Sequence, residues 1–191
     1  MNFNDHSELR GTHAFLSASQ YHWLNYDEAK AIKRYKTHMA TQRGTELHDL
    51  AEHMIRLGIK ANPTGQTFNT YVNDAINFGM TPEVVLFYSY NCYGTADALL
   101  FKDNTLRIHD LKTGETPAHM EQLLIYAALF CLEYKIKPGE LDEIVLRIYQ
   151  YDTHVEYKPT VDEVAHVIDK IITLDKAINN AKKEDRGLAW V

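Results

Sequence analysis

The feature that most constrains the fold is a pair of strand-like segments joined by a two-residue turn. The first segment contains Gly94-Thr95-Ala96-Asp97 and the second contains Asp110-Leu111-Lys112-Thr113-Gly114, with Asp103-Asn104 between them. The segments are rich in β-branched and aromatic residues, and Asp-Asn suits a tight turn. The pattern predicts a β-hairpin. Asp97 and Asp110 each lie six residues outside the turn, so they should face each other.

This hairpin would bring two carboxylates together. Directly opposed side chains have Cβ atoms about 5 Å apart, and like charges there destabilise a sheet unless something compensates. A divalent cation would compensate, because Mg²⁺ is typically held by one or two carboxylates together with substrate phosphates. Lys112 lies two residues beyond Asp110 and therefore on the same face of the strand. Two carboxylates and a lysine at one point predict metal-assisted phosphodiester cleavage.

Length and composition limit the class of protein. A chain of 191 residues with 45% apolar and 24% charged residues suits one soluble globular domain. No apolar run approaches the roughly 18 residues of a membrane span, so no membrane partner is expected. Two cysteines, Cys92 and Cys131, are too few for a disulfide framework or a four-cysteine iron–sulfur cluster, and we expect a cytoplasmic protein. The sequence also lacks a P-loop, so ATP is not an expected cofactor.

The net charge of −6 argues against a protein that coats nucleic acid nonspecifically. Basic residues nevertheless concentrate within 14 residues, and these are Lys30, Lys33, Arg34, Lys36 and Arg43. They indicate either a solvated helix face or a patch that contacts DNA phosphates. Ser17 and Ser19 likewise have two interpretations, as caps of a short helix or as phosphate contacts.

The order of predicted elements indicates an α/β (α+β) fold, with a mixed central β-sheet flanked by helices and an N-terminal helical region. Helices are expected after Ser17, at 27–40, at 44–57 before Gly58, up to residue 78 before Gly79, at 118–134, and after Thr160. Strands are expected at 83–90, 93–102, 105–112 and 144–151, with a further pairing segment at 155–158. We expect a single domain, 1–191, made of a helical part (1–80), a sheet core (81–160) and a C-terminal helix (161–191).

The order of several motifs resembles the PD-(D/E)XK nuclease superfamily, and specifically its RecB-like branch, which includes many phage exonucleases. Gly94 and Asp97, followed by the segment 110–114, match its hairpin. Gln122-Leu123-Leu124-Ile125-Tyr126 is similar to the Gln-x-x-x-Tyr helix motif of this branch, and Gly44-Thr45-Glu46-Leu47-His48 is similar to its Gly-x-x-x-His segment. The serine-rich stretch at 13–19 resembles the opening of phage members. The likeness covers about residues 13–130.

The resemblance implies a restriction-endonuclease-like core and a role for each matching residue. Asp97 and Asp110 would bind Mg²⁺ or Mn²⁺, with the carbonyl of Leu111 as a further ligand and His48 approaching from a helix. Lys112 would position the attacking water or stabilise charge that develops on the phosphate. The chemistry agrees, since a metal ion lowers the pKa of bound water and neutralises phosphate oxygens.

Other interpretations of these residues stay open. A histidine beside an apolar stripe is usually a surface or core residue, and Glu52, one helical turn from His48, could assist the site or replace it. Gln122 and Tyr126 share a helix face. They are either a polar pair satisfied within the core or groups that reach the scissile phosphate.

We therefore expect a Mg²⁺- or Mn²⁺-dependent deoxyribonuclease that hydrolyses DNA phosphodiester bonds, of the phage exonuclease type, in recombination or DNA processing. Its partners would be DNA and a further copy of the chain or a recombination protein, in a bacterial host cytoplasm. The alternatives are a structure-specific endonuclease, a catalytically silent DNA-binding or assembly protein, and a carboxylate enzyme that acts on small phosphates. The sequence leaves open polarity, strand preference, DNA against RNA, metal number and oligomeric state.

Overall fold

The structure is a computed structural model that describes residue 5, residue 7 and residues 11–188, with the side chains of 185–188 left out. The extreme ends of the predicted 1–191 domain therefore lie outside the described residues. The chain divides into two units, one up to Thr45 and one from Glu46 onward. Each unit is described by itself below, and the single domain expected from the sequence stays a prediction.

The first unit contains a short 3-10 helix, η2 (Ala18–Asn25), and the beginning of α1. The prediction that Ser17 and Ser19 cap this helix by their side chains is wrong. Ser17 occupies the N-cap position without a side-chain cap, because its hydroxyl lies 2.8 Å from the Ser19 hydroxyl and the two bond to each other. The backbone carbonyl of Ser17 instead accepts a hydrogen bond from the indole of Trp23 at 2.8 Å.

Helix α1 (Glu28–Leu57) is continuous, although the sequence predicted two helices, 27–40 and 44–57. Gly44 costs helix stability but does not end the helix. On either side of it the threonine hydroxyls of Thr37, Thr41 and Thr45 bond to carbonyls one turn earlier, at 3.1–3.3 Å, which satisfies these polar groups within the helix. Helical spacing therefore continues through the predicted break.

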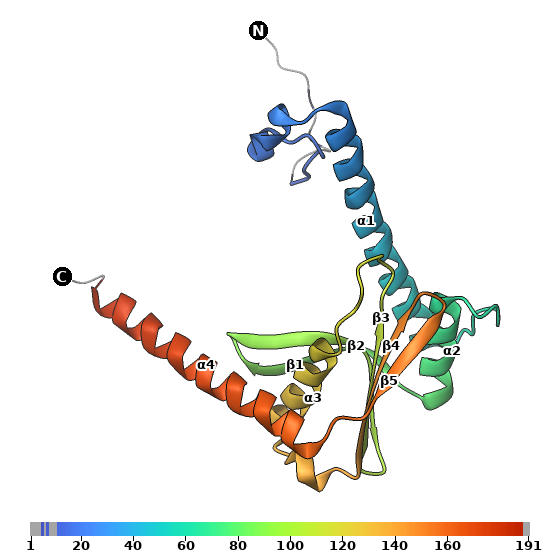
Figure 1. Ribbon diagram of the computed structural model, residues 1–191, viewed down its shortest axis with the longest axis vertical. Helices are drawn as coiled ribbons and strands as arrows, with labels where there is room; N and C mark the ends of the chain where they lie inside the picture. The colour runs from blue at the N-terminus through green and yellow to red at the C-terminus, as the bar shows by residue number, and fades with distance from the viewer. Residues whose placement is uncertain (1–4, 6, 8–10, 189–191) are drawn as a thin grey trace. The chain divides into compact units, whose positions relative to one another are not determined.

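The second unit is built on a five-stranded mixed sheet with the spatial order β1-β2-β3-β4-β5 (Figure 1). Its strands are β1 (Thr81–Ser89), β2 (Cys92–Lys102), β3 (Thr105–Leu111), β4 (Glu143–Gln150) and β5 (Thr153–Tyr157). β3 and β4 pair in parallel and the other neighbours are antiparallel. The parallel pair is joined through α3 (Glu121–Tyr134) and the short 3-10 helix η3 (Pro138–Glu140). The coarse prediction of a mixed sheet flanked by helices is confirmed.

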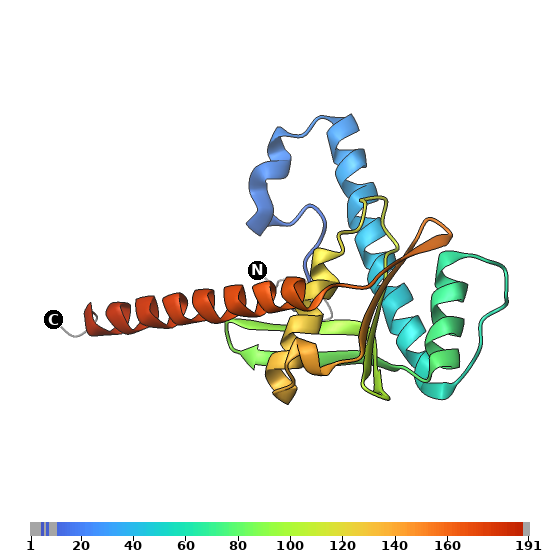
Figure 2. The same cartoon turned by 60° about the horizontal axis from the view of Figure 1, so that its bottom comes forward.

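Two hydrophobic cores cover the sheet. One core is formed with α3 and α4 (Val161–Leu188), and it contains Leu123, Leu146 and Val164 at 0% exposure. The other is formed with α2 (Thr67–Phe78) and the second-unit part of α1, and it contains Val72 and Tyr149 at 0% exposure. Figure 2 shows α4 running from α3 past the turn that joins β1 and β2. Asp175 of α4 accepts hydrogen bonds from that turn.

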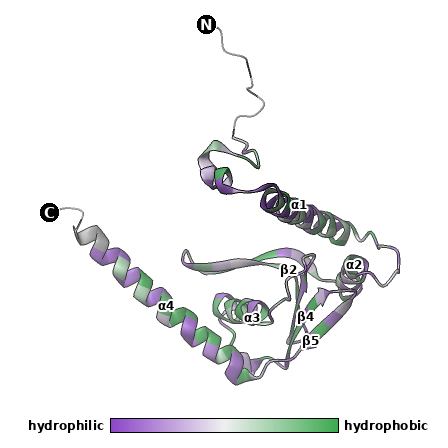
Figure 3. Cartoon of the chain, turned by 45° about the horizontal axis from the view of Figure 1, so that its top comes forward, coloured by the Kyte–Doolittle hydropathy of each residue, from purple (hydrophilic) through white to green (hydrophobic). Residues whose placement is uncertain are grey.

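The helix α3 is buried along most of its length, as predicted, and is coloured mainly as hydrophobic in Figure 3, whereas α4 carries both kinds of residue. Helix α3 begins at Glu121 rather than at residue 118, because the side chain of Gln150, which is only 8% exposed, holds the preceding loop. The Gln150 side chain accepts from the amide of Ala118 and donates to the carbonyls of Gly114 and Thr116. A contact from β4, distant in sequence, thus delays the helix.

Helix ends agree with the local signals. Gly58 and Gly79 end α1 and α2 with φ values of 67° and 73°, a conformation that glycine adopts without strain. Thr160 and Glu163 form the reciprocal hydrogen bonds of a capping box at the start of α4. No helix in the described part of the chain is long and apolar enough to cross a membrane.

Candidate metal centre

The hairpin between β2 and β3 forms in the predicted register. Asp103 and Asn104 make the turn with φ values of 47° and 55°, as a tight two-residue hairpin turn requires. Cα pairing then runs without a shift over five facing pairs, from Lys102↔Thr105 to Ala98↔His109. The next facing positions are Asp97 and Asp110.

Regular pairing of β2 with β3 stops just before the two aspartates. In the described sheet, Asp97 and Asp110 do not form a regular Cα pair, and the Asp97 side chain instead accepts from a backbone donor of β3. Its Oδ2 accepts a hydrogen bond from the amide of Leu111 at 2.8 Å. The chain beyond continues along β4, since the amide of Lys112 donates to the carbonyl of Tyr149 at 2.9 Å. The two carboxylates therefore lie where β2 and β3 separate.

Lys112 connects the second aspartate to helix α3. Its Nζ lies 3.1 Å from Oδ1 and 2.9 Å from Oδ2 of Asp110, and it donates to Oε1 of Gln122 at 2.9 Å. The amide nitrogen of Gln122 in turn donates to the hydroxyl of Tyr126 at 3.1 Å. The structure thus brings the predicted residues into one hydrogen-bonded chain, in which Gln122 contacts the lysine directly.

Gly94 explains how Tyr126 fits beside β2. A Cβ at position 94 would lie only 2.9 Å from Cε1 of Tyr126, which is closer than a carbon–carbon contact allows. The tyrosine ring therefore occupies the space that a side chain would need. The first glycine of the Gly-x-x-Asp segment has a packing role in addition to its place in the motif.

The electrostatics of the site are unfavourable for the carboxylates alone. Burial, together with the charge of Asp110, raises the pKa of Asp97 from 3.8 to about 7, although the Leu111 amide and the Lys112 ammonium oppose the shift. Asp110 is 1% exposed, and its Oδ2 is buried without a hydrogen bond of acceptable geometry even though Lys112 lies 2.9 Å away. A buried, under-satisfied carboxylate oxygen beside a second acid is chemically suited to bind a cation.

His48 of α1 lies beside Asp97. Its Nδ1 is 3.4 Å from Oδ2 of Asp97, and its side chain is 29% exposed. Glu52, the alternative acid on this helix, pairs with Arg56 at 2.8 Å. The carbonyl of Leu111 as a metal ligand stays a prediction.

Two residues near the acids were missed from the sequence. Ligand atoms of Glu83, His48 and Asp97 all lie within 4.8 Å of one another, a spacing that would fit a single metal ion. Burial and the charge of Asp97 raise the pKa of Glu83. Tyr71, 2% exposed, has a pKa raised well above its ordinary value by burial and then by the charges of Asp97 and Glu83. Neither residue belongs to a motif, so no local pattern indicated it.

The residues predicted to contact DNA belong to the first unit. All five basic side chains are exposed on α1. Their helical spacing spreads them over about half of the helix circumference, in the order Arg34, Lys30, Lys33, Lys36 and Arg43. Ser17 and Ser19 are also described in this unit, and contacts of these seven residues with phosphate stay predictions.

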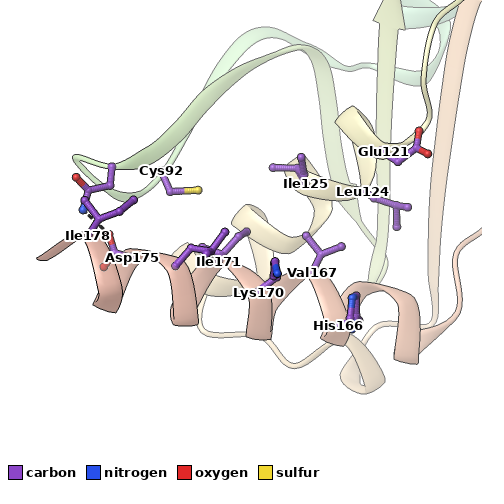
Figure 4. A pocket seen from close by; sticks show the side chains of 12 residues that line it. Cys92, Glu121, Leu124, Ile125, His166, Val167, Lys170, Ile171, Asp175 and Ile178 are labelled. Atoms are coloured by element: carbon purple, nitrogen blue, oxygen red, sulfur yellow. Dashed lines mark hydrogen bonds between the residues drawn. The ribbon is translucent and has the colours of Figure 1, made fainter. Parts of the chain in front are cut away.

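A separate apolar cavity of about 410 Å³ lies between α3, α4 and the beginning of β2 (Figure 4). Leu124, Val167 and Ile171 point into it, with Cys92 at one end. None of the described residues that line it belongs to the predicted site. The cavity is therefore not assigned to the chemistry of the acids. Cys92 and Cys131 are both free thiols.

Comparison with protein-family models, curated proteins and solved structures finds no match to this chain. The functional interpretation therefore depends on the residues and their geometry.

Proposed function

We propose that this protein is a Mg²⁺- or Mn²⁺-dependent deoxyribonuclease with a restriction-endonuclease-like core, of the RecB-like type within the PD-(D/E)XK superfamily. The observation that carries the proposal is the meeting of Asp97, Asp110 and Lys112 where β2 and β3 separate, with the Asp110 carboxylate buried beside a second acid. A mixed sheet with helices on both faces is compatible with such a core. We extend the proposal to exonuclease action in DNA recombination or processing.

The donor set fits a hard divalent cation. Asp97, Asp110 and the Leu111 carbonyl would hold it through oxygen, with His48 as an additional nitrogen ligand. When bound, the cation supplies Lewis acidity that neutralises phosphate oxygens and acidifies water.

The remaining groups orient the reactants. An ammonium has three N–H donors. Lys112 directs donors at Asp110 and Gln122, which leaves one for the phosphate or the attacking water. Tyr126 fixes Gln122, and Gln122 fixes the lysine. In the reaction, the oxygen of water forms a bond to phosphorus and one phosphorus–oxygen ester bond breaks. The proton that the water loses is balanced by the proton that the leaving oxygen gains to become an alcohol.

The first test is Lys112→Ala, with Lys102→Ala as the control because Lys102 is an exposed lysine at the end of β2. Removing a donor that stabilises transition-state charge typically costs about 10²–10³-fold in rate. We expect Lys112→Ala to lose DNA cleavage by at least this factor and to keep DNA binding, while Lys102→Ala cleaves as the wild type does. Equal cleavage by Lys112→Ala and wild type would remove the mechanism.

Substrate topology decides the type of nuclease. Linear duplex DNA and covalently closed circular DNA are incubated with the wild-type protein and Mg²⁺ or Mn²⁺. An exonuclease degrades the linear molecule and leaves the circle intact. Cleavage of the circle would replace the exonuclease proposal with an endonuclease on the same site, and cleavage of neither would contradict the nuclease proposal.

A further inference from the structure

The outer half of α4 carries an apolar stripe that the rest of the described chain leaves uncovered. Apolar residues recur along α4 at alternating intervals of three and four, at Val164, Val167, Ile171, Leu174, Ile178 and Ala181. This spacing keeps them on one side of a helix. The first three pack into the core with α3. In the part of the chain that the structure describes, the last three belong to neither hydrophobic core, and Leu174 and Ile178 are 49% and 42% exposed.

This outer half extends beyond α3 (Figures 1 and 2). It is joined to the turn between β1 and β2 by hydrogen bonds of Asp175, Asn179 and Lys182 with Ser89 and Asn91. Helices shorter than about 12–15 residues are marginal on their own in water, and most helical stability in proteins comes from the packing of an apolar face. A partner that covers the exposed stripe would supply that packing.

The apolar cavity between α3 and α4 is a groove that lies directly beside this stripe (Figure 4). Leu174 and Ile178 line it together with Ile125 of α3, which is 42% exposed. A small-molecule site usually encloses most of its ligand, whereas the exposure of these three side chains shows that the groove is open to solvent along α4. An open apolar groove of this kind suits the apolar face of another helix.

α4 itself has the residues that such a helix requires. Helices that dock in apolar grooves present anchors at positions i, i+3, i+4 and i+7. Leu174, Ile178 and Ala181 occupy i, i+4 and i+7. Because Leu174 and Ile178 also line the groove, each copy of the chain offers both a groove and a docking helix. An interface that uses the same surface on both copies is the kind that a twofold dimer forms.

The charge along α4 favours two copies that run antiparallel. Residues 161–170 contain three acids and one lysine, a net charge of −2 with histidine neutral, whereas residues 175–184 contain three lysines and two acids, a net charge of +1. Antiparallel copies bring the outer half of one α4 towards the beginning of the other, so that opposite charges approach each other. Parallel copies would instead bring like charges together.

We propose that two copies of this protein associate through α4, with Leu174, Ile178 and Ala181 of each copy docked in the α3–α4 groove of the other and the two helices antiparallel. Each copy contributes one helix and one groove, which is at the small end of protein interfaces, so the dimer is in exchange with the monomer and depends on concentration. None of the described residues that line the groove belongs to the candidate metal centre, and the inference therefore does not depend on the nuclease proposal.

The test is the mass of the full chain in solution, measured by sedimentation velocity and light scattering over a series of micromolar concentrations. The wild type is expected to change from monomer to dimer as the concentration rises. Ile178→Glu should raise the dissociation constant of the dimer at least about 10-fold, because each dimer loses a buried isoleucine twice and gains two charges in an apolar groove.

The matched control is Ile172→Glu. Ile172 is an isoleucine of α4 that is 41% exposed, lies on another side of the helix and is not among the described residues that line the groove. This variant should form a dimer as the wild type does. Ile178→Ala, which only removes apolar atoms, should weaken the dimer by a smaller but measurable factor, and it keeps the test decisive if the glutamate variant does not fold. Circular dichroism checks the folding of each variant.

Orientation is measured with spin labels at position 184, introduced as Glu184→Cys in a Cys92→Ser background, in which the remaining Cys131 is buried. Antiparallel copies that overlap over residues 174–181 place each label about 10 Å along the axis from the centre of the overlap, so the two labels lie at least about 20 Å apart. Labels separated only by the spacing of two packed helices, about 8–10 Å, would overturn the antiparallel arrangement.

Three other results would overturn the proposal as a whole. One is a wild type that stays monomeric over the whole concentration series. Another is a dimer that Ile178→Glu weakens no more than Ile172→Glu does. The third is native mass spectrometry that finds a monomer carrying a small apolar molecule, which Ile178→Glu loses, because the groove would then be a ligand site.

Discussion

Replacing Asp97 with asparagine should make the metal-free protein more stable at neutral pH. The asparagine oxygen can still accept the hydrogen bond that the Leu111 amide donates to Asp97 at 2.8 Å. The substitution removes only the charge that burial and Asp110 disfavour. Under the proposed function, Asp97 would be kept for metal binding at a cost in stability, which is typical of functional sites.

The sign and size of the effect follow from the pKa of Asp97. Its pKa is about 7 in the folded protein, compared with an ordinary value of 3.8. Below about pH 4 the carboxyl is protonated in both states, so the stabilisation from its raised pKa is fully present and Asp97→Asn should change little. As the pH rises to about 7, the unfolded chain loses the proton first and the wild type loses stability. A pKa difference of about three corresponds to roughly 4 kcal/mol, which is the upper limit of the effect.

The assay is urea denaturation followed by circular dichroism, in a metal chelator, at several pH values from 4 to 8. The difference in unfolding free energy, Asp97→Asn minus wild type, should rise from near zero to a few kcal/mol. Asp169→Asn, which changes an exposed carboxylate on α4, is the control and should show no such rise. Adding Mn²⁺ at pH 8 should stabilise the wild type more than Asp97→Asn. A difference that is independent of pH, or an Asp97→Asn protein that is less stable at pH 8, would refute the reasoning.

Two further changes test the packing around the site. Gly94→Ala should displace the Tyr126 ring, because its Cε1 would lie 2.9 Å from the new Cβ. We expect a loss of about 1–3 kcal/mol in the free energy of unfolding, together with slower DNA cleavage. An unchanged stability and an unchanged cleavage rate would contradict the close contact. At pH 8, a thiol reagent should modify the half-buried Cys92 of the native protein but not Cys131, which is 2% exposed. Burial raises the pKa of both thiols, that of Cys131 to about 11. Mass spectrometry of the labelled peptides checks this, and rapid labelling of Cys131 would contradict its burial in the α3 core.

Local signals in the sequence were sufficient for much of the fold. Turn residues Asp103 and Asn104 determined the register of β2 and β3, because a two-residue turn leaves one way to pair the strands. Gly58, Gly79 and the capping box at Thr160 correctly marked helix ends, since each acts on its own backbone. Predictions failed where a distant contact decided the outcome, as with the late start of α3, which Gln150 holds from β4.

The candidate site also has a part that the sequence predicted and a part that it did not. The sequence by itself determined that Asp97 and Asp110 approach each other, because they occupy facing positions of one hairpin. It also determined that Lys112 lies on their side of the sheet, because it is two residues beyond Asp110. The motif order implied that His48 approaches Asp97 from a helix, whereas only the tertiary structure brought Glu83 from β1 to it. A bulge near Ser89 decided the position of Glu83, because one extra residue changes every later pairing and no local pattern in the sequence shows where it will occur.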